Sequence, residues 1–248
     1  MEYFIYFLLI IAAIPIVFVG AVVAVGWDFL TRAGKMELRP LPEEEAASHL
    51  KRLLADGIID SDWLEENGFE PAGVYRATEL PGRPNLVGWK KVGERTYFCV
   101  YMFFLSEPIV QLEFMSVFGE RTLTTGSSMS AQSTPPPRGS WQQTFSEPGA
   151  SGLWRHHQAG LDYLAGKTGL RPDDEPSSFA EDLVAVTRRQ VAHARSFLLW
   201  PLQIPRWYFV RRPAFHQKAI WEMPTEGTSA NSQTALGWQG SSKPAPKR

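Results

Sequence analysis

Cysteine is nearly absent from this chain: Cys99 is the single cysteine in 248 residues. One cysteine cannot close an intramolecular disulfide, so the sequence excludes a fold that depends on disulfide bonds. It also excludes the paired cysteine spacing that is typical of structural zinc sites. Cys99 stands in an aromatic and β-branched stretch, residues 97–101, and we interpret it as a small buried side chain.

The short motifs that usually indicate an enzyme are also missing. The sequence has no His-Glu-x-x-His zinc motif, no Gly-x-Ser-x-Gly turn, no phosphate-binding loop and no Gly-x-Gly-x-x-Gly. It contains no module that is typical of nucleic-acid binding. We therefore expect no cofactor, no metal and no nucleic-acid partner, and the sequence favours a non-enzymatic protein.

Charge is missing from the beginning of the chain. From Tyr3 to Gly26 every residue is apolar, aromatic, glycine or proline. At about 1.5 Å per residue, a helix of this length is long enough to cross a bilayer core of about 30 Å. The sequence therefore predicts a single transmembrane anchor over residues 1–27, in contact with the lipid bilayer through residues 3–26.

Two other interpretations of this segment are weaker. A cleaved secretory signal would have a shorter apolar run and cations before it, whereas Glu2 precedes this run. A buried core helix of this length would normally show a polar face. Cations follow the run at Arg32, Lys35 and Arg39, so the positive-inside rule places the N-terminus outside the cell membrane and the following domain in the cytoplasm.

The rest of the chain is long enough for one sizeable domain. Residues 28–42 contain two prolines near their end and are expected to form a juxtamembrane spacer. Three glutamates at 43–45 indicate a helix start, because carboxylates favour the positive end of the helix dipole. Aromatic and β-branched runs between residues 74 and 125, separated by turn residues, predict an antiparallel sheet of about four strands.

Helical spacing returns after residue 149 and again after Ser178. The central predicted strands have few polar positions, so we expect helices to cover both faces of the sheet. This gives an α+β domain over residues 43–223, interrupted by a loop at 126–148. Residues 224–248 are polar, contain proline and are basic at the end, which predicts a disordered tail.

The two parts of the chain differ in charge although the net charge is only −1. Residues 28–185 contain 15 Lys and Arg against 23 Asp and Glu, whereas residues 186–248 contain 10 against 2. A basic C-terminal part either neutralises its own acidic domain or is attracted to an anionic surface.

Candidate catalytic residues are few. Histidine and aspartate provide acid–base groups, and we list four weak candidates for a hydrolase site: His156, His157, Asp162 and His193. Neighbouring histidines point about 100° apart on a helix, so they cannot hold one metal together. Any such site would depend on the tertiary fold to bring these residues together.

The most specific feature after the apolar run combines aromatic rings with arginines. We predict a membrane-interface contact there, since rings rest at headgroup depth and guanidinium groups pair with lipid phosphates. The candidates are Trp200, Arg206, Trp207, Tyr208, Arg211 and Arg212. The same rings could instead cover the sheet or contact a protein partner.

The sequence as a whole predicts a non-enzymatic binding or scaffold module held at the cytoplasmic face of a membrane. The alternatives are a membrane-anchored hydrolase with a His/Asp site and an accessory subunit of a membrane complex. The partner is expected to be an anionic lipid or a protein.

Overall fold

The computed structural model of the chain describes residues 2–80, 82–104, 108–127, 134–147, 149–174, 177–198 and 200–223. The segment 224–248 lies outside the described residues, so its predicted disorder stays a prediction.

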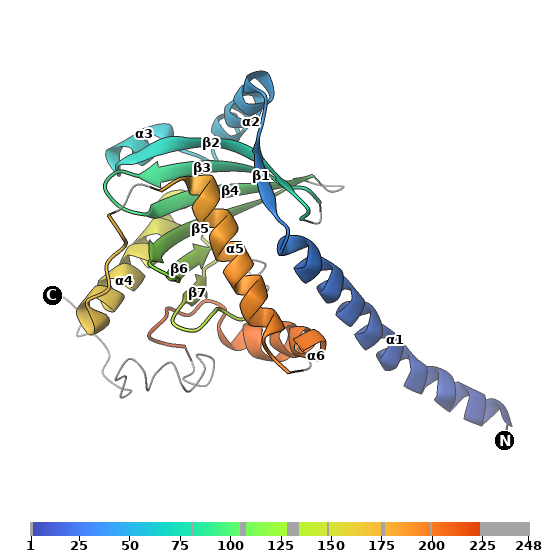
Figure 1. The fold of residues 1–248 in the computed structure, drawn as a ribbon. Coiled ribbons are helices and arrows are strands. Elements are labelled where there is room, and N and C mark those ends of the chain that lie inside the picture. The colour runs from blue at the N-terminus through green and yellow to red at the C-terminus, as the bar shows by residue number, and fades with distance from the viewer. Residues whose placement is uncertain are drawn as a thin grey trace.

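A single sheet of seven strands forms the centre of the fold (Figure 1). The strands follow one another across the sheet in chain order, and each pair from β1 to β6 is antiparallel, whereas β7 runs parallel to β6. Their bounds are β1 (Glu37–Pro40), β2 (Phe69–Thr78), β3 (Asn85–Lys91), β4 (Thr96–Phe104), β5 (Pro108–Phe118), β6 (Arg121–Gly126) and β7 (Trp141–Thr144).

The prediction of about four antiparallel strands is wrong, because the sheet is mixed and has seven. The missed strand β1 lies within the segment expected to be a spacer, and β7 lies within the expected loop at 126–148. Both are four-residue strands at the two edges of the sheet. A strand this short has too few residues to show a clear alternation of apolar and polar positions, so its pairing with a longer neighbour decides its conformation.

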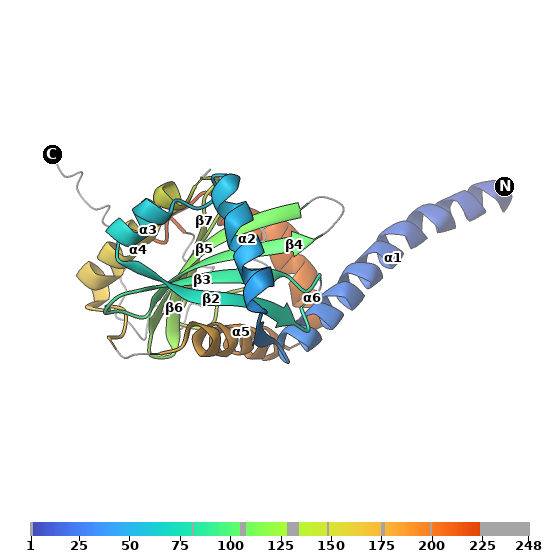
Figure 2. The same ribbon diagram turned by 90° about the horizontal axis from the view of Figure 1, so that it is seen from above.

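Helices pack on both faces of the sheet, which confirms the α+β class. Figure 2 shows α5 on one side and α2, α3 and α4 on the other. The helices are α1 (Glu2–Ala33), α2 (Glu43–Ala55), α3 (Ser61–Glu66), α4 (Ala150–Thr168), α5 (Phe179–Arg195) and α6 (Trp200–Pro205); a π-helical segment η2 (Arg206–Arg211) and a short 3-10 helix η3 (Arg212–Ala214) follow.

Alternate residues of the central strands serve two different cores. Phe98 and Phe114 stack at a centroid distance of 4.7 Å on the side of α4. Tyr97 and Met115 point to the other side, where they pack with Phe179 of α5. This two-sided burial agrees with the scarcity of polar residues in these strands.

The structure also contradicts the transmembrane anchor predicted over residues 1–27. Within the part of the chain that the structure describes, no helix combines the length and the apolarity that crossing a membrane requires. This finding overturns the single-pass membrane topology. The end of α1 has a different role in the structure: Leu30 and Ala33 are buried against Val191 and Ala194 of α5.

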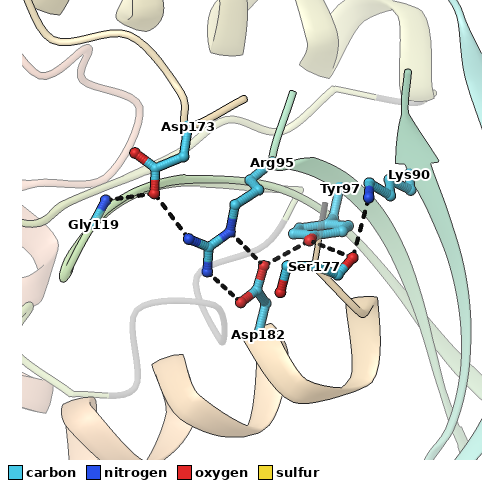
Figure 3. A network of polar contacts seen from close by, with 7 residues as sticks. All are labelled: Lys90, Arg95, Tyr97, Gly119, Asp173, Ser177 and Asp182. Carbon is cyan, nitrogen blue, oxygen red and sulfur yellow. Dashed lines mark hydrogen bonds and ion pairs between the residues drawn. The ribbon is translucent and has the colours of Figure 1, made fainter. Parts of the chain in front are cut away.

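An ion-pair network holds the start of α5 against the sheet (Figure 3). Arg95, next to the start of β4, donates from Nε to Asp182 Oδ2 at 3.0 Å and from Nη1 to Asp173 Oδ2 at 2.8 Å. The Tyr97 hydroxyl donates to Asp182 at 2.6 Å. Burial alone would raise the pKa of Asp182, but the hydrogen bonds from Arg95 and Tyr97 outweigh burial and hold this pKa below its ordinary value.

Replacing Asp182 with asparagine should destabilise the fold strongly. The side chains of Asp182 and Arg95 are 6% and 16% exposed, so D182N would leave a largely buried guanidinium opposite a neutral amide. Losing one member of a buried pair costs about 3–5 kcal/mol when the remaining charge has no other partner, and because Asp173 still pairs with Arg95 we expect a loss at the lower end of this range, about 3 kcal/mol. Urea denaturation should show this decrease in the free energy of unfolding, whereas the exposed neighbour should tolerate E181Q with a change of about 0.5 kcal/mol or less. Equal stability of D182N and E181Q would contradict the role of the pair.

Candidate functional site

His157 lies in a polar network between α4 and the sheet. Its Nε2 is 2.8 Å from Ser116 Oγ on β5, and its Nδ1 is 2.8 Å from Thr125 Oγ1 on β6. Ser116 Oγ is also 2.7 Å from Thr96 Oγ1 on β4. Gln143 of β7 donates to Thr125 Oγ1 at 2.9 Å, so side chains from four adjacent strands take part.

The serine–histidine contact has the distance that a nucleophile and its base require, but its surroundings exclude that chemistry. Ser116 and His157 are both 0% exposed, so no substrate reaches either atom. Burial lowers the pKa of His157 to about 3, which keeps the imidazole neutral. Both ring nitrogens have hydrogen-bond partners, and the network is therefore a structural element of the core.

The other three hydrolase candidates do not join His157. His156 is half-buried, lies 3.0 Å from Glu147 Oε1 and stacks on the ring of Phe145. Asp162 is exposed on α4. His193 belongs to α5 on the opposite face of the sheet, where burial, aided by the charge of Arg138, lowers its pKa.

The described residues thus contain no cleft in which these histidines and the aspartate converge. In the same part of the chain, no three His, Cys, Asp or Glu side chains gather closely enough to hold a metal ion.

The predicted interface residues divide into interior and surface positions. Trp207 is buried against Phe215, at a centroid distance of 5.4 Å, and Arg212 is buried with its guanidinium carbon 3.4 Å from the ring centroid of Tyr208. Trp200 and Arg211 are half-buried, whereas Arg206 and Tyr208 are exposed.

This segment packs beside α1. Trp200 stacks on Trp27 at a centroid distance of 4.7 Å, and Phe209 lies 6.0 Å from Phe18. Figure 2 also shows α6 beside the C-terminal end of α1. The two ring pairs lie nine residues apart on α1, so η2 and α6 follow the helix over more than two turns.

Large apolar side chains are exposed on α1 and between Leu198 and Val210. We call them the apolar surface, and it consists of Val17, Phe18, Val19, Val25, Trp27, Leu198, Leu202, Tyr208, Phe209 and Val210. Leu198 is 87% exposed, and Val25 and Val210 are each about 70% exposed. The apolar run and the arginines are evident in the sequence, whereas the packing of α1 beside α6 and η2 is evident only in the tertiary structure.

The chain around this surface is strongly basic. Between Val186 and Trp221 the sequence contains six arginines and one lysine and no acidic residue. Arg206 is exposed next to the apolar side chains, and Arg195 lies over the Trp200 ring at 5.8 Å. The site therefore combines exposed apolar groups with positive charge.

Replacing His157 with asparagine should change how stability depends on pH. The folded-state pKa of about 3 lies below the ordinary 6.5, so the unfolded chain binds a proton first as the pH falls. Between pH 6.5 and about pH 3, His157 therefore lowers the free energy of unfolding by about 1.4 kcal/mol for each unit by which the pH falls. Denaturant titrations between pH 7 and 4 should give a shallower loss of stability for H157N than for the wild type.

The neighbouring substitution H156N is the matched control, because His156 is half-buried at the surface. We expect H156N to keep the steeper slope of the wild type. Parallel pH profiles for the wild type and H157N would contradict a neutral, buried His157.

No protein-family model matches this chain, and neither a curated protein nor a solved structure does so. The function therefore has to be argued from the residues of this molecule.

Proposed function

We propose that this protein is a non-enzymatic interaction module that rests on an anionic lipid surface through its apolar surface. The supporting observation is the gathering of exposed apolar side chains on α1 and residues 198–210, two segments far apart in sequence that pack together. The contact is interfacial: the helices lie against the headgroup region, and no crossing of the bilayer is involved.

The apolar surface offers ten exposed large apolar side chains for such a contact. Exposed apolar side chains that gather on one part of a molecule are typical of interaction sites. Complete burial of a large apolar side chain contributes about 1.5–3 kcal/mol, so partial burial of several of them gives a useful affinity. Trp27 and Tyr208 are exposed at this surface and have the ring chemistry that favours the headgroup region.

Charge favours a lipid surface over a second copy of the chain. Residues 186–221 contain seven cations without an acid, so two copies that met through this region would place like charges opposite each other. An anionic leaflet instead attracts each basic residue near it by about 1 kcal/mol. The hydrolase alternative has no such support, because its candidate residues lie apart in the described structure.

Vesicle flotation of the full chain tests this proposal. We expect the wild type to float with vesicles that contain phosphatidylglycerol, more weakly with pure phosphatidylcholine, and less at high salt. The variant F18D/L202D/F209D should lose at least several-fold in the floating fraction, because it places carboxylates on the apolar surface. R206Q/R211Q should mainly lose the preference for the anionic lipid.

The matched control is L54D/V92D, which changes two exposed apolar residues outside the apolar surface. It should float like the wild type, and circular dichroism should show that all variants are folded. Failure of the wild type to float, or an equal loss in the control, would overturn the proposal. A stable dimer that F18D/L202D/F209D dissociates would identify a second copy as the occupant instead.

A further inference from the structure

An apolar groove lies between helix α2 and the sheet. Strands β2 and β3 form its floor, and α2 forms a wall. Figure 2 shows α2 crossing over these strands. The volume of the groove is about 240 Å³. Most of the side chains that line it are apolar, and they include Ala46, Ala47, Leu50, Val74, Val87 and Trp89.

The groove exists because small side chains of α2 face an irregular part of the sheet. Ala46 and Ala47 reach less far toward the strands than Leu53, which is 1% exposed farther along the helix and fills the space beneath it. On the sheet side, the register of β2 against β3 shifts between Pro71 and Gly73, and such a bulge bends a strand locally. Ala47 and Pro71 are exposed, so the groove opens to solvent between them.

The size and chemistry of the groove suit a side chain of a peptide. Pockets for drug-sized ligands have volumes of about 300–1,000 Å³ and contain a few convergent polar groups. This groove is smaller, and Glu43 carries the one polar side chain among the described residues that line it. One large apolar side chain, with the peptide backbone outside the groove, is therefore a better occupant than a cofactor.

The surface around the groove is acidic. Residues 43–70, which form α2, α3 and the beginning of β2, contain nine Asp and Glu against two Lys and Arg. Glu43 and Glu44 are exposed in the first turn of α2, and Glu70 is exposed next to Pro71. An apolar side chain that is accompanied by cations complements this region, whereas an acidic peptide would be repelled.

The chain itself contains a segment with this combination. In residues 224–248, which lie outside the described residues, Leu236 and Trp238 are the only large apolar side chains, and Glu226 is the only acidic one. Three cations follow within ten residues of the tryptophan, at Lys243, Lys247 and Arg248. Polar segments with so few large apolar side chains can order when they bind a folded surface.

This segment begins on the same face of the sheet as the groove. Trp221 packs against the core cluster that contains Leu53 of α2, and the backbone N–H of Ile220 donates to a glutamine side chain of β7. From β7 to β2 there are five strand spacings of about 4.8 Å, or about 24 Å. Fifteen residues separate Met223 from Trp238, and an extended chain of this length reaches about 50 Å. Trp238 is therefore within reach of the groove.

We propose that the groove beneath α2 binds the segment around Trp238 of the same chain. The indole ring enters the groove, and the three cations that follow it lie over the acidic residues of α2 and α3. Tryptophan is among the residue types that most often anchor such contacts, because its ring buries a large apolar area. The contact is separate from the apolar surface, and it closes the groove to other peptides while the segment is bound.

Disulfide trapping in the full chain tests this contact. The variant A47C/Q239C places one thiol at the exposed rim of the groove and the other next to Trp238. In a glutathione redox buffer, we expect it to form a disulfide within one chain at least roughly tenfold faster than A55C/Q239C. Each rate is taken relative to the reaction of the same thiols with glutathione, and Cys99 is too deeply buried to compete.

A55C/Q239C is the matched control, because Ala55 is also exposed on α2, about 12 Å farther along the helix. Tethering alone brings the second thiol to both positions at a similar effective concentration. Adding W238A to A47C/Q239C should reduce its rate to that of the control. Adding K243Q/K247Q/R248Q, or raising the salt concentration, should reduce the rate by a smaller factor.

Peptide mass spectrometry identifies the linked residues, and circular dichroism shows that each variant is folded. Equal rates for A47C/Q239C and A55C/Q239C, or an unchanged rate after W238A is added, would overturn the proposal. A disulfide between two chains, separated by non-reducing electrophoresis, would also overturn it and would identify a second copy of the chain as the source of the bound segment.

Discussion

Burial of the central strands on both faces is the constraint on which the rest of the structure depends. Phe98 and Phe114 complete the core beneath α4, while Tyr97 and Met115, their neighbours in sequence, complete the core beneath α5. A shift of one residue in strand register would exchange the two sets. The sheet therefore needs helices on both sides, and these come from segments before and after it in the sequence.

Three interior ionisable groups show three ways of tolerating burial. His157 stays neutral and has hydrogen-bond partners at both ring nitrogens. Asp182 stays charged because Arg95 lies beside it. Glu113 has the Tyr101 hydroxyl as a hydrogen-bond partner, and burial raises its pKa to about 7.

The helix α1 links the core to the surface. Its end contributes Leu30 and Ala33 to the contact with α5, and one turn earlier Trp27 is exposed while it stacks on Trp200. The same helix thus fixes the position of α6 and presents the apolar side chains around it. A lipid surface that binds the apolar surface would therefore contact a part of the molecule that already packs against the sheet domain through α5.

The sequence alone determined the α+β class, the central strands and the need for helices on both faces, because long runs with a clear period report which side chains are buried. It also implied that His156 and His157 could not hold one metal ion together, since neighbours on a helix diverge. It missed β1 and β7 and wrongly assigned the apolar run to a membrane span. Only the tertiary structure decided that His157 is buried between α4 and the sheet and that α1 packs beside α6. These features depend on contacts between distant segments, for which local periodicity carries no signal.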